Sequence, residues 1–217
     1  MKLDGGDPVR LTTNPGGDFF PAWSPDDRQI LFHSSRTGNR ELFSMSADGT
    51  GEQQLTTEKM ELYAPQLSPD GRHLYAYAGS GAGAGRPRYD VVFDKDAAGR
   101  WTNMRRVTPD HPSVWFRLSH DGQWIAYVSA VPDAPPGNWT SAMAVRTDGK
   151  EDHVVLDMMP AEQATFAAFG KDAGTLFVMT RRAACAMMPR TGSAGGISRR
   201  MGGGCSLRSR RTRATCT

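Results

Sequence analysis

The 217-residue chain carries 26 Lys and Arg against 23 Asp and Glu, a formal net charge of +3. The charge is unevenly distributed, because residues 181–217 hold nine Arg and no Lys, Asp or Glu, which leaves a net charge of −6 on residues 1–180. All three cysteines lie in the same final segment, which excludes a disulfide framework for residues 1–180. No segment approaches the roughly 20 apolar residues of a transmembrane helix, and no apolar run follows Met1 and Lys2.

A twelve-residue phrase recurs along the chain, and its successive copies begin 44, 51 and 51 residues apart. Three consecutive residues near the end of each copy are apolar, at 30–32, 74–76, 125–127 and 176–178, which is typical of a strand covered on both faces. Self-similarity at such a period indicates a repeat architecture. The copies are WSPDDRQILFHS (23–34), LSPDGRHLYAYA (67–78), LSHDGQWIAYVS (118–129) and a worn FGKDAGTLFVMT (169–180).

The Ser-Pro-Asp-Gly start of the phrase predicts a β-turn. Proline suits the second turn position, aspartate the third, and glycine accepts the positive φ that follows. Asp27 replaces the glycine in the first copy, and aspartate tolerates the same conformation. The repeated aspartates Asp26, Asp70 and Asp121 are therefore assigned to turn geometry rather than to a metal site. Each copy thus predicts a hairpin, with an incoming strand before the turn.

Two further strands follow each of the first three hairpins. In the first copy ELFSMS precedes the turn ADGTGE and the final strand QQLTT, and a similar LT phrase ends the segment PVRLT before the first hairpin. Four short antiparallel strands in each unit of roughly 40 to 50 residues match one blade of a β-propeller. The sequence therefore predicts an all-β fold, a β-propeller of four-stranded antiparallel blades.

These residues resemble a known family. The stretch RLTTNPGGDFFPAWSPDDRQILFHSSRTGNRELFSMSADGTGEQQLTT is similar to the WD-like repeat of TolB-type periplasmic propellers, with its pattern LT…P.WSPDG..I.F.S.R.G…LY….DG…LT. The resemblance covers about residues 3–180. It implies a protein-binding propeller whose partner is an envelope protein of the Tol–Pal type, in the periplasm. Related blades also occur in prolyl-oligopeptidase-type peptidases and ahead of secreted amidohydrolases.

The repeats define the expected domain organisation, which is an open arc of about three and a half blades. An open arc would expose the apolar side chains Phe166, Phe169, Leu176 and Val178 of its last partial blade. We expect the last strand of a preceding blade at 3–11, blades at about 12–57, 58–108 and 109–158, a partial blade at 159–180, and a tail at 181–217.

The tail has a composition unlike that of the repeats. It lacks Phe, Tyr, Trp and Val as well as acidic residues, and no third strand is expected in the sequence that follows LFVMTRR. One interpretation is out-of-frame translation of GC-rich DNA, and the others are a disordered segment or a basic arm. The tail cysteines lack a Cys-x-x-Cys pair and a nearby histidine, so no zinc site is expected. They are Cys185, Cys205 and Cys216.

No catalytic or metal-binding constellation stands out among the remaining residues. The histidines are scattered and are expected to be structural or exposed: His33, His73, His111, His120 and His153. Ser193 lies in TGSAGG, which has the wrong spacing for a nucleophile elbow. The loop GSGAGAG at 79–85 lacks the Lys-Ser/Thr of a phosphate loop. Asn138 fits a glycosylation sequon, which means little in a chain that looks bacterial.

The sequence therefore predicts a non-enzymatic binding and scaffolding propeller with no cofactor, no metal and no nucleic-acid partner. The alternative is the non-catalytic propeller of a peptidase or amidohydrolase whose catalytic domain is absent, and a propeller that binds sugars or other ligands is a third hypothesis. Fold does not decide between them, because functional sites are grafted onto folds.

Overall fold

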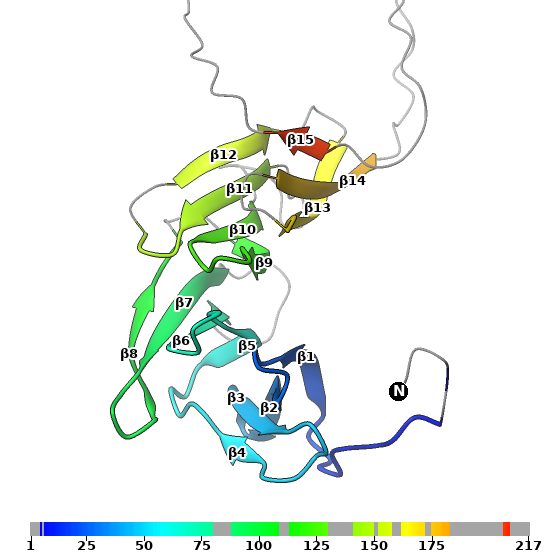
Figure 1. The fold of residues 1–217 in the computed structure, drawn as a ribbon, viewed down its shortest axis with the longest axis vertical. Helices are drawn as coiled ribbons and strands as arrows, with labels where there is room; N and C mark the ends of the chain where they lie inside the picture. Colours follow the sequence, from blue (N-terminus) through cyan, green and yellow to red (C-terminus); the bar gives the residue numbers. More distant parts are fainter. Residues whose placement is uncertain are drawn as a thin grey trace, which may run out of the picture. The chain divides into compact units, whose positions relative to one another are not determined.

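The computed structural model describes residues 5, 7–79, 88–108, 113–129, 141–149, 152–157, 162–171, 175–182 and 206–208. The regular structure within these ranges is entirely β, as Figure 1 shows. In this part of the chain there is no helix long and apolar enough to cross a membrane. The chain divides into two compact units, Met1–Asp110 and His111–Thr217, which are described separately below.

The first unit contains two four-stranded antiparallel sheets, each with its strands in sequence order. The first sheet consists of β1 (Asp18–Trp23), β2 (Gln29–Thr37), β3 (Asn39–Ser46) and β4 (Gln53–Gln54). The second consists of β5 (Glu61–Leu67), β6 (His73–Gly79), β7 (Arg88–Lys95) and β8 (Trp101–Arg106).

The second unit contains a four-stranded and a three-stranded antiparallel sheet. These sheets confirm the predicted all-β fold built from four-stranded blades, with one incomplete blade among the described residues. The first of them consists of β9 (Ser113–Leu118), β10 (Trp124–Ser129), β11 (Ser141–Arg146) and β12 (Asp152–Asp157). The other consists of β13 (Glu162–Phe169), β14 (Thr175–Arg182) and β15 (Ser206–Arg208).

The hairpin turns are held by a repeated serine and aspartate. In the first sheet Ser24 Oγ donates to Asp26 Oδ1 at 2.6 Å and accepts the Gln29 N–H at 2.9 Å. Donation from the serine hydroxyl is the main cause that holds the pKa of each turn aspartate below its usual value. The equivalent groups in the next two hairpins are Ser68, Asp70 and His73, then Ser119, Asp121 and Trp124. The aspartates thus act in turns, as predicted.

The LT phrase also has a structural role. Thr56 Oγ1 accepts the Leu42 N–H at 3.0 Å and donates to the buried Glu41 Oε2 at 2.6 Å. Thr108 Oγ1 accepts the Asp90 N–H at 2.9 Å at the equivalent place in the second sheet. The threonine therefore satisfies a buried backbone donor of the third strand where the fourth strand ends.

The core of the first unit lies between its two sheets. Leu31 and Leu42 of the first sheet pack against Leu62, Leu74 and Ala76 of the second, and all five side chains are buried. Leu55, from the LT phrase of the first sheet, packs against the same cluster. Residues at alternate positions of β2 thus face the following sheet, which explains why the predicted strand is apolar on both sides.

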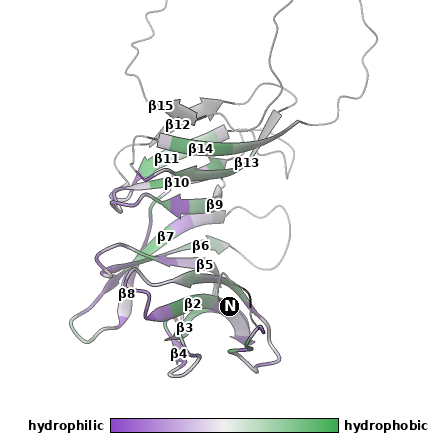
Figure 2. Cartoon of the chain, turned by 45° about the vertical axis from the view of Figure 1, so that its right-hand side comes forward, coloured by the Kyte–Doolittle hydropathy of each residue, from purple (hydrophilic) through white to green (hydrophobic). Residues whose placement is uncertain are grey.

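The second unit repeats this arrangement and corrects one expectation. Leu176 is only 6% exposed, and Phe169 and Val178 pack against the same core cluster, which includes Ala126 and Val128 of β10. Arg117 of β9 lies 4.9 Å from the centre of the half-buried Phe166 ring. The expected exposure of Phe166, Phe169, Leu176 and Val178 is therefore wrong, because this face packs on the sheet before it. Figure 2 shows hydrophobic colour along β10, β11 and β14.

The two ends of the predicted repeat region also differ from expectation. Residues 7–17 form no strand, although Leu11 packs against buried side chains of the first sheet. In the segment 181–217, β14 extends to Arg182 and β15 pairs with Thr175–Phe177 as a third strand, so the expectation of no third strand in the tail is wrong. The remaining tail residues lie outside the described ranges, so the tail as a whole stays a prediction.

Candidate binding surface

A β-bulge shapes the first strand of the first sheet. Phe19 pairs with His33 and Ala22 with Leu31, so β1 has one residue more than β2 between these pairs, and Phe20 takes a φ of +53°. Consecutive strand residues normally point to opposite faces, but a bulge re-aims one of them. Both Phe19 and Phe20 consequently stack on His33, with ring centres 5.7 and 5.5 Å away. Ala64 of β5 and Trp115 of β9 have positive φ at the equivalent position.

The buried imidazole of His33 supports the Phe19 and Phe20 rings. Its side chain is 2% exposed, the Tyr63 ring meets it edge-on at 5.3 Å, and the Ala64 N–H donates to its Nδ1 at 3.4 Å. Burial, with a further contribution from the charge of Arg40, lowers the pKa of His33 to about 4. The imidazole is therefore neutral at pH 7, and its Nδ1 acts as the acceptor that joins the two sheets of the first unit.

The two phenylalanine rings are partly exposed. Phe19 is 50% and Phe20 is 38% exposed, and we call this pair the aromatic patch. Exposed aromatic rings that rest on a rigid buried layer lose little conformational freedom when a partner covers them. The patch therefore has the properties of a protein contact site.

An ion pair lies next to the buried layer. Arg40 Nη1 donates to Glu61 Oε2 at 2.6 Å, and the Arg40 guanidinium lies 5.3 Å from the centre of the Tyr63 ring. Tyr63 also donates its hydroxyl to Glu61 at 3.3 Å, and its ring stacks on Tyr77 at 5.0 Å. The hydrogen bond to Glu61 raises the pKa of Arg40, so the Arg40 guanidinium stays charged.

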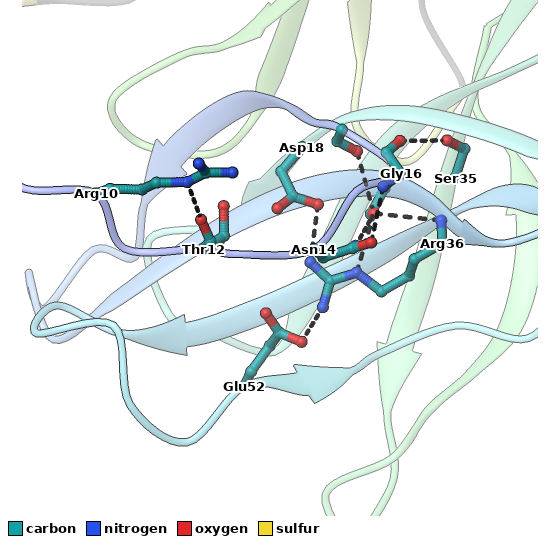
Figure 3. Close-up of polar contacts among 10 residues, drawn as sticks. Arg10, Thr12, Asn14, Gly16, Asp18, Ser35, Arg36 and Glu52 are labelled. Carbon is teal, nitrogen blue, oxygen red and sulfur yellow. Dashed lines mark hydrogen bonds and ion pairs between the residues drawn. The ribbon is translucent and has the colours of Figure 1, made fainter.

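A second polar cluster is centred on Arg36 and anchors the segment before β1, as Figure 3 shows. Arg36 donates to Ser34 Oγ at 3.0 Å and to Asp18 Oδ1 at 2.8 Å, and it pairs with Glu52. Asn14 reaches the same Ser34 hydroxyl at 3.4 Å. Desolvation raises the pKa of Asp18, but hydrogen bonds from Arg36 and Ser34 outweigh it, so the net shift is downward. Arg36 matches the arginine of the quoted F.S.R.G pattern.

The Arg36 guanidinium also covers apolar side chains. Its central carbon lies 4.7 Å from the Phe43 ring centre and 5.5 Å from that of Phe32. These two rings belong to a buried cluster against which Leu11 packs. Leu11 and Arg36 together cover the face of the first sheet that is turned away from the second sheet.

The structure disperses the histidines that the sequence singled out. His73 Nδ1 lies 2.9 Å from Asp94 Oδ1, and Arg105 and Asn103 donate to the other oxygen of Asp94. His120 lies exposed in a hairpin turn. His153 was expected near a blade connection, but its backbone lies within β12, opposite Ala144. Outside the described residues lie His111, Asn138, Ser193, Cys185, Cys205, Cys216 and positions 80–85 of the glycine-rich loop.

The described side chains support contact and structure more directly than chemistry. The buried hydroxyl of Ser34 donates to the Gly17 carbonyl and accepts from Arg36, so it is committed to the fold. Within the ranges that the structure describes, no group of three or more His, Cys, Asp or Glu side chains is placed to hold a metal ion. Sequence analysis missed the aromatic patch, because nothing in DFFPAW shows on which side of the strand each ring lies.

Comparison with known proteins places the repeat in a family. The model of the TolB β-propeller domain matches residues 1–114. The uncharacterized protein Atu1656 of Agrobacterium fabrum is 37% identical over 71 residues, which are 33% of this chain and 24% of that protein.

Two solved structures share the fold. A structure from Agrobacterium tumefaciens described as a TolB protein has a TM-score of 0.57 at 22% identity, over 70% of this chain and 53% of that one. A puromycin-hydrolyzing peptidase of Mycobacterium tuberculosis has a TM-score of 0.57 at 18% identity, over 75% of this chain and 28% of that one. The chain thus spans about half the length of the first structure and about a quarter of the second. On the match over residues 1–114, the chain belongs to the TolB β-propeller family.

Proposed function

We propose that the chain is a non-enzymatic propeller that binds another protein through the aromatic patch of its first sheet. The observation that carries this proposal is the exposure of Phe19 and Phe20, at 50% and 38%, above the buried imidazole of His33. Aromatic anchors on a rigid support are typical of the residues that dominate protein interfaces. The neutral state of His33 keeps the support of this contact free of buried charge.

Membership of the TolB family supports the kind of partner and the compartment. We propose a periplasmic envelope protein of the Tol–Pal type as the partner. The alternative, a non-catalytic propeller of a prolyl-oligopeptidase-type peptidase or an amidohydrolase, is supported by the fold shared with the mycobacterial peptidase. The two proposals differ in the partner, which is a separate envelope protein in the first and a catalytic domain in the second.

The test is a titration of the immobilised full chain with the purified Pal-type lipoprotein encoded in the same genome. Phe19→Ser with Phe20→Asn removes both rings, and asparagine tolerates the positive φ at position 20. We expect saturable binding that weakens about tenfold or more in this variant. Val9→Ser, at a side chain that is 79% exposed, is the control and should bind like the parent chain.

Two results would count against the proposal. If the parent chain and the double variant bind equally well, the aromatic patch is not the contact. If the purified chain hydrolyses peptide or ester substrates, the non-enzymatic assignment is wrong.

A further inference from the structure

The outer face of β14 carries two exposed apolar side chains at positions that are buried elsewhere in the repeat. Phe177 is 51% and Met179 is 64% exposed, and we call this pair the end face. Phe177 lies eight residues after the start of its hairpin phrase and corresponds to Leu31 and Ala126, which are at most 1% exposed. The end face therefore differs from its equivalents in what covers it rather than in its apolar character.

The equivalents show what normally covers this position. Leu31 packs against the second sheet of the first unit, and Ala126 packs against β13 and β14 in the second unit. In each case the covering element is the following sheet of the same repeat. The end face thus continues a sheet-on-sheet interface that the chain forms twice.

Other residues of each repeat, at the end of its first strand, face the preceding sheet. Leu67 packs against the cluster shared with the first sheet, and Phe169 packs against the cluster shared with β10. The equivalent residue of the first sheet is Trp23, which is 57% exposed. Trp23 pairs with Ile30, so its ring lies on the face that Leu11 and Arg36 cover only in part.

We propose that the end face of one copy of this chain docks on Trp23 of a second copy. Both sheet-on-sheet contacts inside the units join residues that face the next sheet to residues that face the previous one. In a second copy, Trp23 lies at a position that faces the previous sheet, so it can pair with the end face in the same way. Two end faces would instead join two surfaces that both face the next sheet. The contact is therefore head to tail. Because few side chains take part in it, we expect weak association, with a Kd of about 10 μM or higher.

The test is sedimentation velocity of the full chain over protein concentrations from about 1 μM to about 1 mM. A reducing agent is present so that the three cysteines do not create disulfide-linked dimers. The variants are Phe177→Thr with Met179→Thr, which removes the end face, and Trp23→Thr, which removes its receptor. Val9→Thr, at an exposed apolar residue outside both surfaces and outside the aromatic patch, is the control. Circular dichroism checks that each variant is folded.

We expect the mean mass of the parent chain and of Val9→Thr to rise with concentration. Each of the other two variants should associate at least about tenfold more weakly. A mixture of these two should form a 1:1 pair, because one retains the end face and the other retains Trp23. A parent chain that stays monomeric overturns the proposal. So does a Trp23→Thr protein that still associates like the parent, which would indicate that end faces meet each other. If Trp23→Thr does not fold, undiminished association of the end-face variant alone is enough to reject the contact.

Discussion

The first sheet and the sheet containing β13 and β14 are built from the same repeat but differ in what covers their outward faces. On the outward face of the first sheet, Leu11 and the Arg36 guanidinium cover Ile30, Phe32, Phe43 and Met45, which are at most 9% exposed, although Trp23 at the edge of this face stays 57% exposed. The outward face of β14 keeps Phe177 and Met179 more than half exposed. An apolar strand is therefore buried on both sides only where the chain supplies a second cover.

The largest expected effect is at a position where the cover is complete. Leu31→Ala should lower the free energy of unfolding by about 3.5 kcal/mol, because it opens a cavity between the two sheets of the first unit. Guanidinium chloride unfolding followed by circular dichroism measures this loss. Val9→Ala, at a 79% exposed side chain, should cost less than about 0.5 kcal/mol. A cost for Leu31→Ala as small as that of Val9→Ala would contradict the assigned core.

The junction behind the aromatic patch should make stability depend on pH. The pKa of His33 is about 4 in the folded chain, against an ordinary value of 6.5 for histidine, so the unfolded chain binds more protons between these values. Stability should fall as the pH drops from 6.5 to 4, by at most about 3 kcal/mol from this group. Below that window Asp18, Asp70 and Asp94, whose pKa values are lowered by folding, lose their contributions as they become protonated.

Unfolding midpoints measured at intervals from pH 7 to pH 4 test this assignment. His33→Asn keeps an acceptor near the Nδ1 position but does not titrate, so it should flatten the slope in that window. A slope that is unchanged in His33→Asn would assign the pH dependence to other groups.

The cover over the first sheet should be the next most sensitive element. Arg36→Ala removes the partner of Asp18 and Glu52 and uncovers Phe43, so we expect a loss of about 2 to 3 kcal/mol. Arg100→Ala is the matched control, because its ion pair with Asp96 involves a 77% exposed arginine and should contribute little to stability. Chemical unfolding compares the two variants directly. Equal losses would mean that Arg36 does not act as a cover.

The repeat fold could be predicted from the sequence because several independent local signals indicated the same structure. The spacing of the hairpin phrase, its turn residues and the LT threonine all indicated four-stranded blades, and Asp27, Gly71 and Gly122 take the positive φ that the turns require. These are local signals, since each depends on residues close together in the chain.

The two surfaces could not be predicted in the same way. A strand that is apolar at consecutive positions does not reveal which side meets the preceding sheet, so Leu176 and Val178 were expected to be exposed in place of Phe177 and Met179. The bulge at Phe20 was equally hidden, because a bulky residue gives no sign of positive φ. The pairing of β15 with β14 joins segments far apart in the sequence, and no local pattern marks it.

The smallest expected effect gives the most direct test of the difference between the two faces. Phe177→Ala is the counterpart of Leu31→Ala, because the two residues hold the same repeat position. Measured by chemical unfolding at a dilution where the chain is monomeric, it should change the free energy of unfolding by less than about 0.5 kcal/mol, since the ring is already 51% exposed. A loss of about 3 kcal/mol, comparable with that of Leu31→Ala, would show that Phe177 is buried within the monomer and would contradict an open end face.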